Sequence, residues 1–430
     1  MRIRDRLIKG TILNFIAVAF NQGSTLIINI IIARILLKDV FGEYAIVQST
    51  LLTVATISQL ATGYTASKYI AEYRSSDPER AGRIMGLLAI VSAMMAIAGA
   101  IILICMAPWL ANTMLKAPHL AVPLMLGSGF LFFSSINGYQ TGALSGLEAY
   151  GSLAKAGIVS GVMAVGSISL GALWGGLNGT LIGLSLSAFV RCTIHFIWLW
   201  YESRGQHIKP TYKGSFIQEK KIIFKFALPA AIAGYYSMPM IWLANSLLVR
   251  QPGGYGEMGL FSAANNLRIL ILFLPNVVNS VGLSVLNNEK AKKDLKNFNR
   301  VFKSNVLFIF IVSLCCVLII GIFGRTILHF FGKEFVAGHY ILWFLVCSSF
   351  FESISIALYQ YIQSHSKIWL SFFTISLPRE AFFVLVAYYL VKTSGGEGLG
   401  VAYLSAAILG IILHILLVFI LYSKESRLSL

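Results

Sequence analysis

The sequence predicts an all-α membrane protein with twelve transmembrane helices, arranged as two six-helix bundles that are parallel repeats around a central cleft. The first observation is composition, since the 430 residues are 57% hydrophobic and only 12% charged. The second is arrangement. Apolar residues gather in blocks of about 20 with almost no charge, the length that a helix needs to cross roughly 30 Å of hydrocarbon. The third is that the blocks form two similar sets, one on each side of a basic loop.

Six spans are predicted before that loop. The basic stretch Met1 to Gly10 leads into the first apolar block. It resembles the start of a signal peptide, but the block is too long and more spans follow, so we interpret it as a membrane helix. The predicted spans cover residues 11–33, 44–67, 84–107, 120–147, 153–174 and 178–201.

The loop holds several lysines and arginines against only Glu202 and Glu219, so it cannot lie in hydrocarbon. We therefore predict an N-terminal bundle (1–201), a cytoplasmic basic linker (202–221) and a C-terminal bundle (222–430). The six later spans are predicted at residues 222–249, 258–286, 304–323, 338–363, 368–391 and 398–422.

The charge distribution predicts the orientation. Alternate connections, counted together with the adjoining span ends, hold 24 and 7 of the 34 Lys and Arg residues, and the other three lie deeper within spans. The richer set includes both termini and the linker, which places them in the cytoplasm. A net charge of +17 would suggest a nucleic-acid partner in a soluble domain. Here membrane topology accounts for it, and no nucleic acid is expected.

Weak sequence matches indicate an internal duplication. Gly42-Glu43 aligns with Gly256-Glu257 at an offset of 214 residues, and Ala143-Leu144 aligns with Ala357-Leu358 at the same offset. Because six helices return the chain to the side from which it started, the copies are expected to be parallel repeats with a cleft at mid-bilayer.

Polar residues within the later spans are the first candidates for a functional site. A charge at the bilayer centre costs at least about 2.5–3.5 kcal/mol, so it needs a partner or a protein-lined cavity. On a helix, Arg268 shares an arc of roughly 120° with Asn265, Asn276 and Asn279, which predicts a stripe facing the lumen. A hydrogen-bonded seam between helices is the alternative.

Two acids lie in similar positions. Glu352 and Tyr359 share one face of the tenth span, and Arg379-Glu380 lies halfway through the eleventh. Glu352 and Glu380 are candidates for proton or cation coupling. A structural ion pair with an arginine is the alternative for each.

Earlier spans contribute fewer candidates. Asn21 belongs to a polar face of the first span, and Arg191 and His195 share a face of the sixth. Arg191 is close enough to the cytoplasmic end that snorkelling to the interface is an equal alternative.

No motif indicates a cofactor, a metal or catalysis. The run Gly395 to Gly400 lacks a preceding soluble strand and a GK[ST] ending, so we interpret it as a turn between helices. The five cysteines lie in apolar blocks without metal-ligand spacing. We therefore expect a protein that is not an enzyme.

The opening of the chain resembles a known family. Ala33-Arg34-Ile35-Leu36 followed by Phe41-Gly42-Glu43-Tyr44 is similar to the start of the bacterial polysaccharide-transporter flippases called Wzx, in the multidrug/oligosaccharidyl-lipid/polysaccharide superfamily. The chain departs from that pattern at Leu37-Lys38-Asp39, where Gly-Pro is common.

The resemblance implies a flippase of the bacterial inner membrane. Such a protein moves undecaprenyl-diphosphate-linked oligosaccharide, such as an O-antigen unit, from the inner to the outer leaflet by alternating access. Arg268 and Arg379 would suit the diphosphate, and Asn, Gln, Tyr and Trp side chains the sugars. Expected partners are the lipid-linked oligosaccharide, membrane lipids and polysaccharide-assembly proteins. The alternatives are a multidrug exporter of the same superfamily and, less favoured, a membrane-embedded glycan polymerase or ligase.

Overall fold

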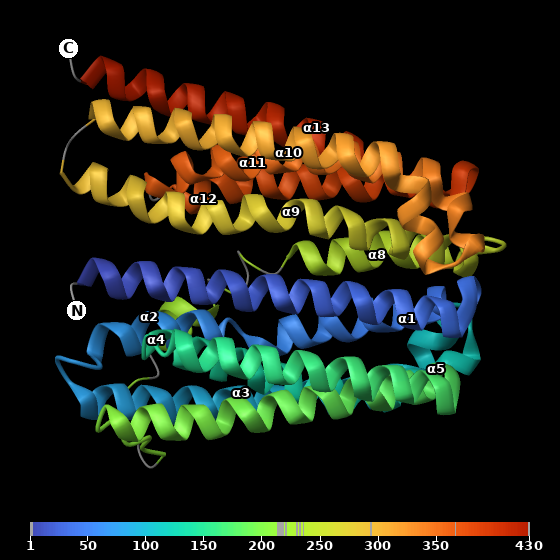
Figure 1. Cartoon of the computed structure of the whole chain (residues 1–430), viewed down its shortest axis with the longest axis horizontal. Coiled ribbons are helices and arrows are strands. Elements are labelled where there is room, and N and C mark those ends of the chain that lie inside the picture. The colour runs from blue at the N-terminus through green and yellow to red at the C-terminus, as the bar shows by residue number, and fades with distance from the viewer. Residues whose placement is uncertain are drawn as a thin grey trace. The chain divides into compact units, whose positions relative to one another are not determined.

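The computed structural model describes the chain apart from residues 1–2, 213–218, 220–221, 229–230, 232–233, 235, 293–294, 366 and 429–430. Every regular element in the described part is helical (Figure 1). The chain forms two compact units, Met1–Trp242 and Leu243–Leu430.

The first unit is built mainly from long helices that lie side by side (Figure 1). Two of them hold two predicted spans each, because the backbone breaks at Leu37 in α1 and at Gly176 in α5. The helices are α1 (Ile3–Gln59), α2 (Thr62–Tyr73), α3 (Pro78–Trp109), α4 (Ala121–Gly146) and α5 (Tyr150–Gly205), with short turns at Leu110–Met114, Pro118–Leu120 and Ile223–Ala227.

The second unit follows the same plan. Its last helix also contains two predicted spans, separated at Ser394–Gly395. The elements are α8 (Ser237–Val249), which contains the boundary between units, then α9 (Gly254–Ala291), α10 (Leu295–Phe331), α11 (His339–Ser364), α12 (Ile368–Ser371) and α13 (Leu377–Leu428), with short turns at Lys333–Gly338 and Phe372–Ser376.

The predicted span at residues 44–67 is not a single helix. The prediction for 44–67 was wrong in this respect, because α1 ends at Gln59 and the chain passes through left-handed Leu60 and Ala61 before α2 begins. The reason is a close approach to α4: a Cβ on Gly63 would lie 2.4 Å from the carbonyl oxygen of Gly138.

The internal duplication extends to backbone geometry. Gly175 and Gly176 have φ/ψ of −138°/18° and 53°/−133°, and Ser394 and Gly395 have −131°/15° and 51°/−129°. The two turns are 219 residues apart. Only glycine adopts the second conformation of each pair readily. The same chain reversal is therefore built twice.

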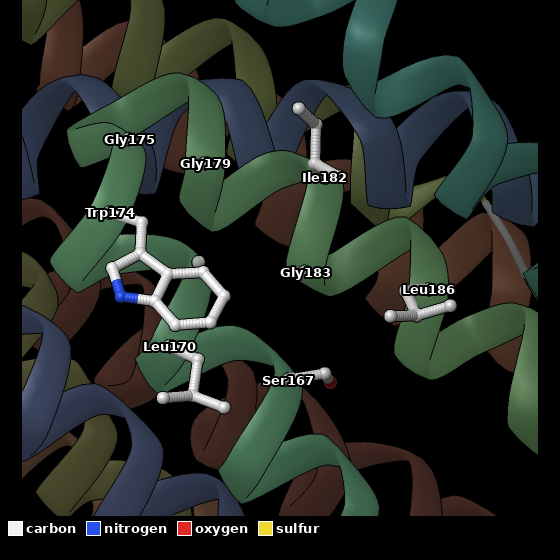
Figure 2. Close-up of a pocket in the computed structure, with 9 residues that line it drawn as sticks. Ser167, Leu170, Trp174, Gly175, Gly179, Ile182, Gly183 and Leu186 are labelled. Atoms are coloured by element: carbon white, nitrogen blue, oxygen red, sulfur yellow. The ribbon is translucent and has the colours of Figure 1, made fainter.

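The α5 hairpin carries an apolar hollow of about 400 Å³. Figure 2 shows Trp174, Leu170 and Leu186 around it, with Gly179 and Gly183 at its wall. Trp174 is 84% exposed. In a membrane-spanning helix, such exposed apolar side chains are in contact with lipid.

Described residues of the predicted linker pack against helix α3 of the first unit. The Thr211 amide donates to the Gly82 carbonyl at 3.0 Å. The buried Glu219 carboxylate accepts from Arg80 Nε at 3.2 Å and lies 3.7 Å from Arg83 Nε. This pairing raises the pKa of Arg80. Lys213, Lys220 and Lys221 of the predicted linker lie outside the described residues.

The boundary between compact units also lies further along the chain than the predicted start of the second bundle at residue 222. Trp242 Nε1 donates to Thr50 Oγ1 at 2.8 Å, which ties the start of α8 to α1 within the first unit.

Candidate functional site

Helices α1, α4 and α5 of the first unit surround a polar cavity of about 250 Å³. Both halves of α1 contribute, because the chain reverses at Leu37 and returns Gln48 to the level of Asn29. The polar residues that line the cavity are Thr25, Asn29, Gln48, Ser134, Asn137, Ser187 and Arg191.

The polar face of α1 arises from helical spacing. Asn21, Thr25 and Asn29 are four residues apart and so lie on one face. Thr25 Oγ1 donates to the Asn21 carbonyl at 2.9 Å, and Asn29 Nδ2 donates to the Thr25 carbonyl at 3.0 Å. These bonds satisfy part of the stripe within the helix, and its three residues line the polar cavity or an adjoining one.

Arg191 is the cation of this site. It is an exposed residue that lines the polar cavity and an adjoining one of about 210 Å³, which Asn21 also lines. Among the described residues, no carboxylate forms an ion pair with Arg191. A guanidinium in a membrane-spanning segment that lacks such a partner requires water or an anion.

His195 does not line either cavity. It is buried one turn further along α5, and its Nδ1 donates to the Arg191 carbonyl at 2.8 Å. It therefore contributes to the helix rather than to the cavity wall.

In the second unit, Arg268 is neutralised. Its Nη2 pairs with Glu352 Oε2, and its Nη1 donates to Asn265 Oδ1 at 3.3 Å. Its guanidinium carbon lies 4.8 Å from the centre of the Tyr403 ring. The two charged side chains are only 12% and 23% exposed. This is the arrangement expected of a structural ion pair.

Arg379 also has a carboxylate partner. Its Nη2 pairs with Glu380 Oε1, and the Glu380 side chain is 5% exposed. A Cβ on Gly410 would lie 3.1 Å from Arg379 Cδ, so glycine leaves room for the arginine stem. Both arginines that were predicted to bind the diphosphate therefore form an ion pair with a glutamate.

The remaining predicted residues form local contacts. Asn276 is exposed and donates to the Leu272 carbonyl at 2.8 Å. The Asn279 carbonyl accepts from Gln360 Nε2 at 3.4 Å. The Tyr359 ring lies edge-on to His414, with 6.1 Å between ring centres.

Asn29 and Asn137 were missed as site residues. Asn29 continues the four-residue spacing of Asn21 and Thr25, so the periodicity of α1 contained the signal. Asn137 lies in a span with many small and apolar residues, and only the packing of α4 against α1 and α5 places it at the cavity.

Comparison with known proteins identifies the family. The family profile described as "Polysaccharide biosynthesis protein" matches residues 7–286. The chain belongs to this polysaccharide biosynthesis protein family. The resemblance inferred from Ala33 to Tyr44 is thereby confirmed. The EPS I polysaccharide export inner membrane protein EpsE of Ralstonia nicotianae is 23% identical over 416 residues, covering 94% of this chain and 91% of that protein.

Solved structures show the fold of this family member. It is similar to the inward-facing conformation of a multidrug resistance MATE family transporter of the MOP superfamily, with a TM-score of 0.73 and 17% identity over 95% of this chain and 99% of the other. The outward-facing conformation of such a transporter gives a TM-score of 0.70, again at 17% identity, over 98% and 96%. The predicted twelve-helix membrane fold is confirmed, and family and fold together point to a transporter.

Proposed function

We propose that the protein is a flippase that moves undecaprenyl-diphosphate-linked oligosaccharide from the inner to the outer leaflet of the bacterial inner membrane by alternating access. The observation that carries the proposal is the Arg191 cavity, a polar space within a membrane-spanning bundle whose cation has no acidic partner among the described residues. The family and the export function named for the EpsE relative support a polysaccharide precursor as the substrate.

The chemistry of the cavity fits a phosphorylated glycan. A guanidinium presents a planar set of donors that matches phosphate oxygens, and its attraction to an anion is stronger away from bulk water. Amide and hydroxyl groups beside it supply the donors and acceptors that sugar hydroxyls need. We assign the diphosphate to Arg191.

The same proposal gives Arg268 and Arg379 a structural role in place of substrate binding. Because each already pairs with an acid, these arginines stabilise the second unit. The alternative is that they bind substrate directly, together with Asn265, Asn276, Asn279 and Tyr359. Glu352 and Glu380 stay the candidates for proton or cation coupling. Outward movement of an anion across an inside-negative potential gains about 2.3 kcal/mol per charge per 100 mV, so the potential can also help to drive export.

Replacing Arg191 tests the assignment. Arg191→Ala should abolish export of lipid-linked glycan in cells that lack the native gene, and Arg191→Lys should restore part of it, because lysine keeps the charge and loses the planar donor set. Export is measured as surface polysaccharide, with protein level in the membrane measured in parallel.

Arg204→Ala is the matched control. Arg204 lies near the predicted cytoplasmic end of the same helix, and its guanidinium carbon is 3.9 Å from the centre of the Trp200 ring. It lines neither cavity. It should leave export unchanged. Normal export in Arg191→Ala would remove this residue from the mechanism.

The fold neighbours favour one second candidate, a multidrug exporter. A cationic drug would favour acidic side chains in the binding cavity, because an opposite charge attracts it. Among the described residues, the walls of the two Arg191 cavities contain an arginine and no acid. Efflux of a cationic dye by the purified protein in liposomes would support this candidate against the flippase.

A further inference from the structure

We propose that the cavity on the Gln48 side of Arg191 is a sugar subsite, in which the side-chain amides of Gln48 and Asn137 recognise the first sugar attached to the diphosphate. This inference rests on the proposed function and adds to it the residues that select the glycan. Three features of the site carry it.

The first feature is the position of Arg191 between two compartments. Arg191, Thr25 and Ile28 line both, whereas Asn21 lines only the smaller and Gln48 only the larger. An anion held at Arg191 therefore has space on two sides. On the predicted topology the first half of α1 runs outward, so Asn29 and the Gln48 compartment that it lines lie further outward than Asn21.

The second feature is unused hydrogen-bonding capacity. Among the described residues, none bonds to the Gln48 amide. Asn137 donates one Nδ2 hydrogen to Gln140 Oε1 at 3.3 Å, which leaves its Oδ1 as an acceptor. Gln48 and Asn137 are both half-buried. A sugar hydroxyl that enters beside them would therefore give up hydrogen bonds to water and form hydrogen bonds to these amides.

The third feature is that the larger compartment is built from separate helices with both polar and apolar walls. Gln48 comes from α1 and Asn137 from α4, and Phe130 and Leu52 supply apolar surface between them. A sugar ring has hydroxyls at its edge and C–H groups on its faces, and needs both kinds of wall. The volume of about 250 Å³ suits one small ring rather than a chain of them.

The smaller compartment lacks this combination. There the Asn21 carbonyl accepts from Thr25 within α1, so part of the polar surface is already satisfied by the helix itself. We therefore assign the sugar to the larger compartment.

Binding of three lipids by the purified full chain in nanodiscs tests the proposal. The probes are undecaprenyl diphosphate alone and the same lipid with a single N-acetylglucosamine or a single galactose, with affinities measured by native mass spectrometry. The wild type should bind at least one sugar-bearing lipid about tenfold more tightly than the bare lipid, because two to three added hydrogen bonds have about this effect.

The variants Gln48→Met and Asn137→Leu keep the side-chain volume and remove the amide. Each should reduce the preference for the sugar-bearing lipid by about three- to tenfold and leave the affinity for bare undecaprenyl diphosphate unchanged. Asn178→Ala is the matched control, since Asn178 is an exposed amide at the α5 hairpin. It should change neither affinity.

The outcomes separate the two levels of the proposal. A wild type that binds all three lipids equally, or variants that weaken all three to the same extent, would overturn the sugar subsite and leave the flippase standing. Arg191→Ala should weaken binding of all three. If the wild type bound none of them, the flippase proposal would fall, and the subsite with it.

Discussion

Three arginines lie within the predicted spans, and their surroundings differ. Arg268 and Arg379 each pair with a glutamate in the second unit, whereas Arg191 lines a polar cavity in the first and has no acidic partner in the described chain. A paired guanidinium attracts a further anion weakly, because the carboxylate has already neutralised it. Position in a span therefore does not decide function by itself; the neighbouring acid does.

The Arg268–Glu352 pair can be tested by removing one partner or both. Arg268→Ala should lower the thermal stability of the purified protein, because it leaves Glu352 largely buried without its partner, and breaking such pairs costs about 3–5 kcal/mol when they are fully buried. The cost is smaller here, since Glu352 is 23% exposed. The double variant Arg268→Ala/Glu352→Ala should recover stability, and it should recover export as well if the pair is purely structural.

Arg34→Ala serves as the control for loss of a positive charge, since Arg34 is an exposed residue at the end of the first predicted span. A double variant that is stable but exports nothing would show that the pair is more than structural, with Arg268 binding substrate, as the lumen stripe of α9 suggested, or Glu352 taking part in coupling.

Among the elements, the helix hairpins at Gly176 and Gly395 have the same backbone conformation, one in each unit. In each, a left-handed residue reverses the chain between two spans, and a helix backbone approaches its partner closely. A Cβ on Gly179 would lie 2.0 Å from the Gly171 carbonyl oxygen, and one on Gly398 would lie 2.2 Å from that of Leu390. Small residues allow this packing where no hydrophobic effect drives helices together.

Gly176 and Gly175 form a matched pair for testing the backbone requirement. Neither has an atom within 4 Å of an added Cβ, but only Gly176 has a positive φ, at 53°. Gly176→Ala should therefore destabilise the protein by about 1–3 kcal/mol, seen as a lower melting temperature in detergent. Gly175→Ala should have little effect. Equal effects of the two substitutions would mean that the hairpin does not depend on the left-handed conformation.

For the whole molecule, orientation in the membrane follows from charge. The connections that carry most of the lysines and arginines are expected in the cytoplasm. Reporter fusions should therefore give a cytoplasmic signal at His207, within the predicted linker, and an outside signal at Gly254, the first residue of α9. A fusion at Ser423 should match His207. An outside signal at His207 would contradict the twelve-helix arrangement.

The sequence by itself determined the helical membrane class, the approximate spans and the polar faces of α1, α9 and α11. These features depend on local composition, because a segment of about 20 apolar residues must form a helix in hydrocarbon to satisfy its backbone. The turn at Gly176 also lay between two predicted spans. The interruption after Gln59 did not show in the composition, because it arises from contact with α4.

Tertiary structure alone decided which polar faces meet. Glu352 is 84 residues from Arg268, and Gln48, Asn137 and Arg191 come from three helices. The sequence left a pair between Glu380 and an arginine open, although adjacent residues on a helix do not face each other. Long side chains nonetheless bring their charges together. Packing between helices in a membrane depends on small residues and polar contacts far apart in the chain, so the site could be read only once those helices were in place.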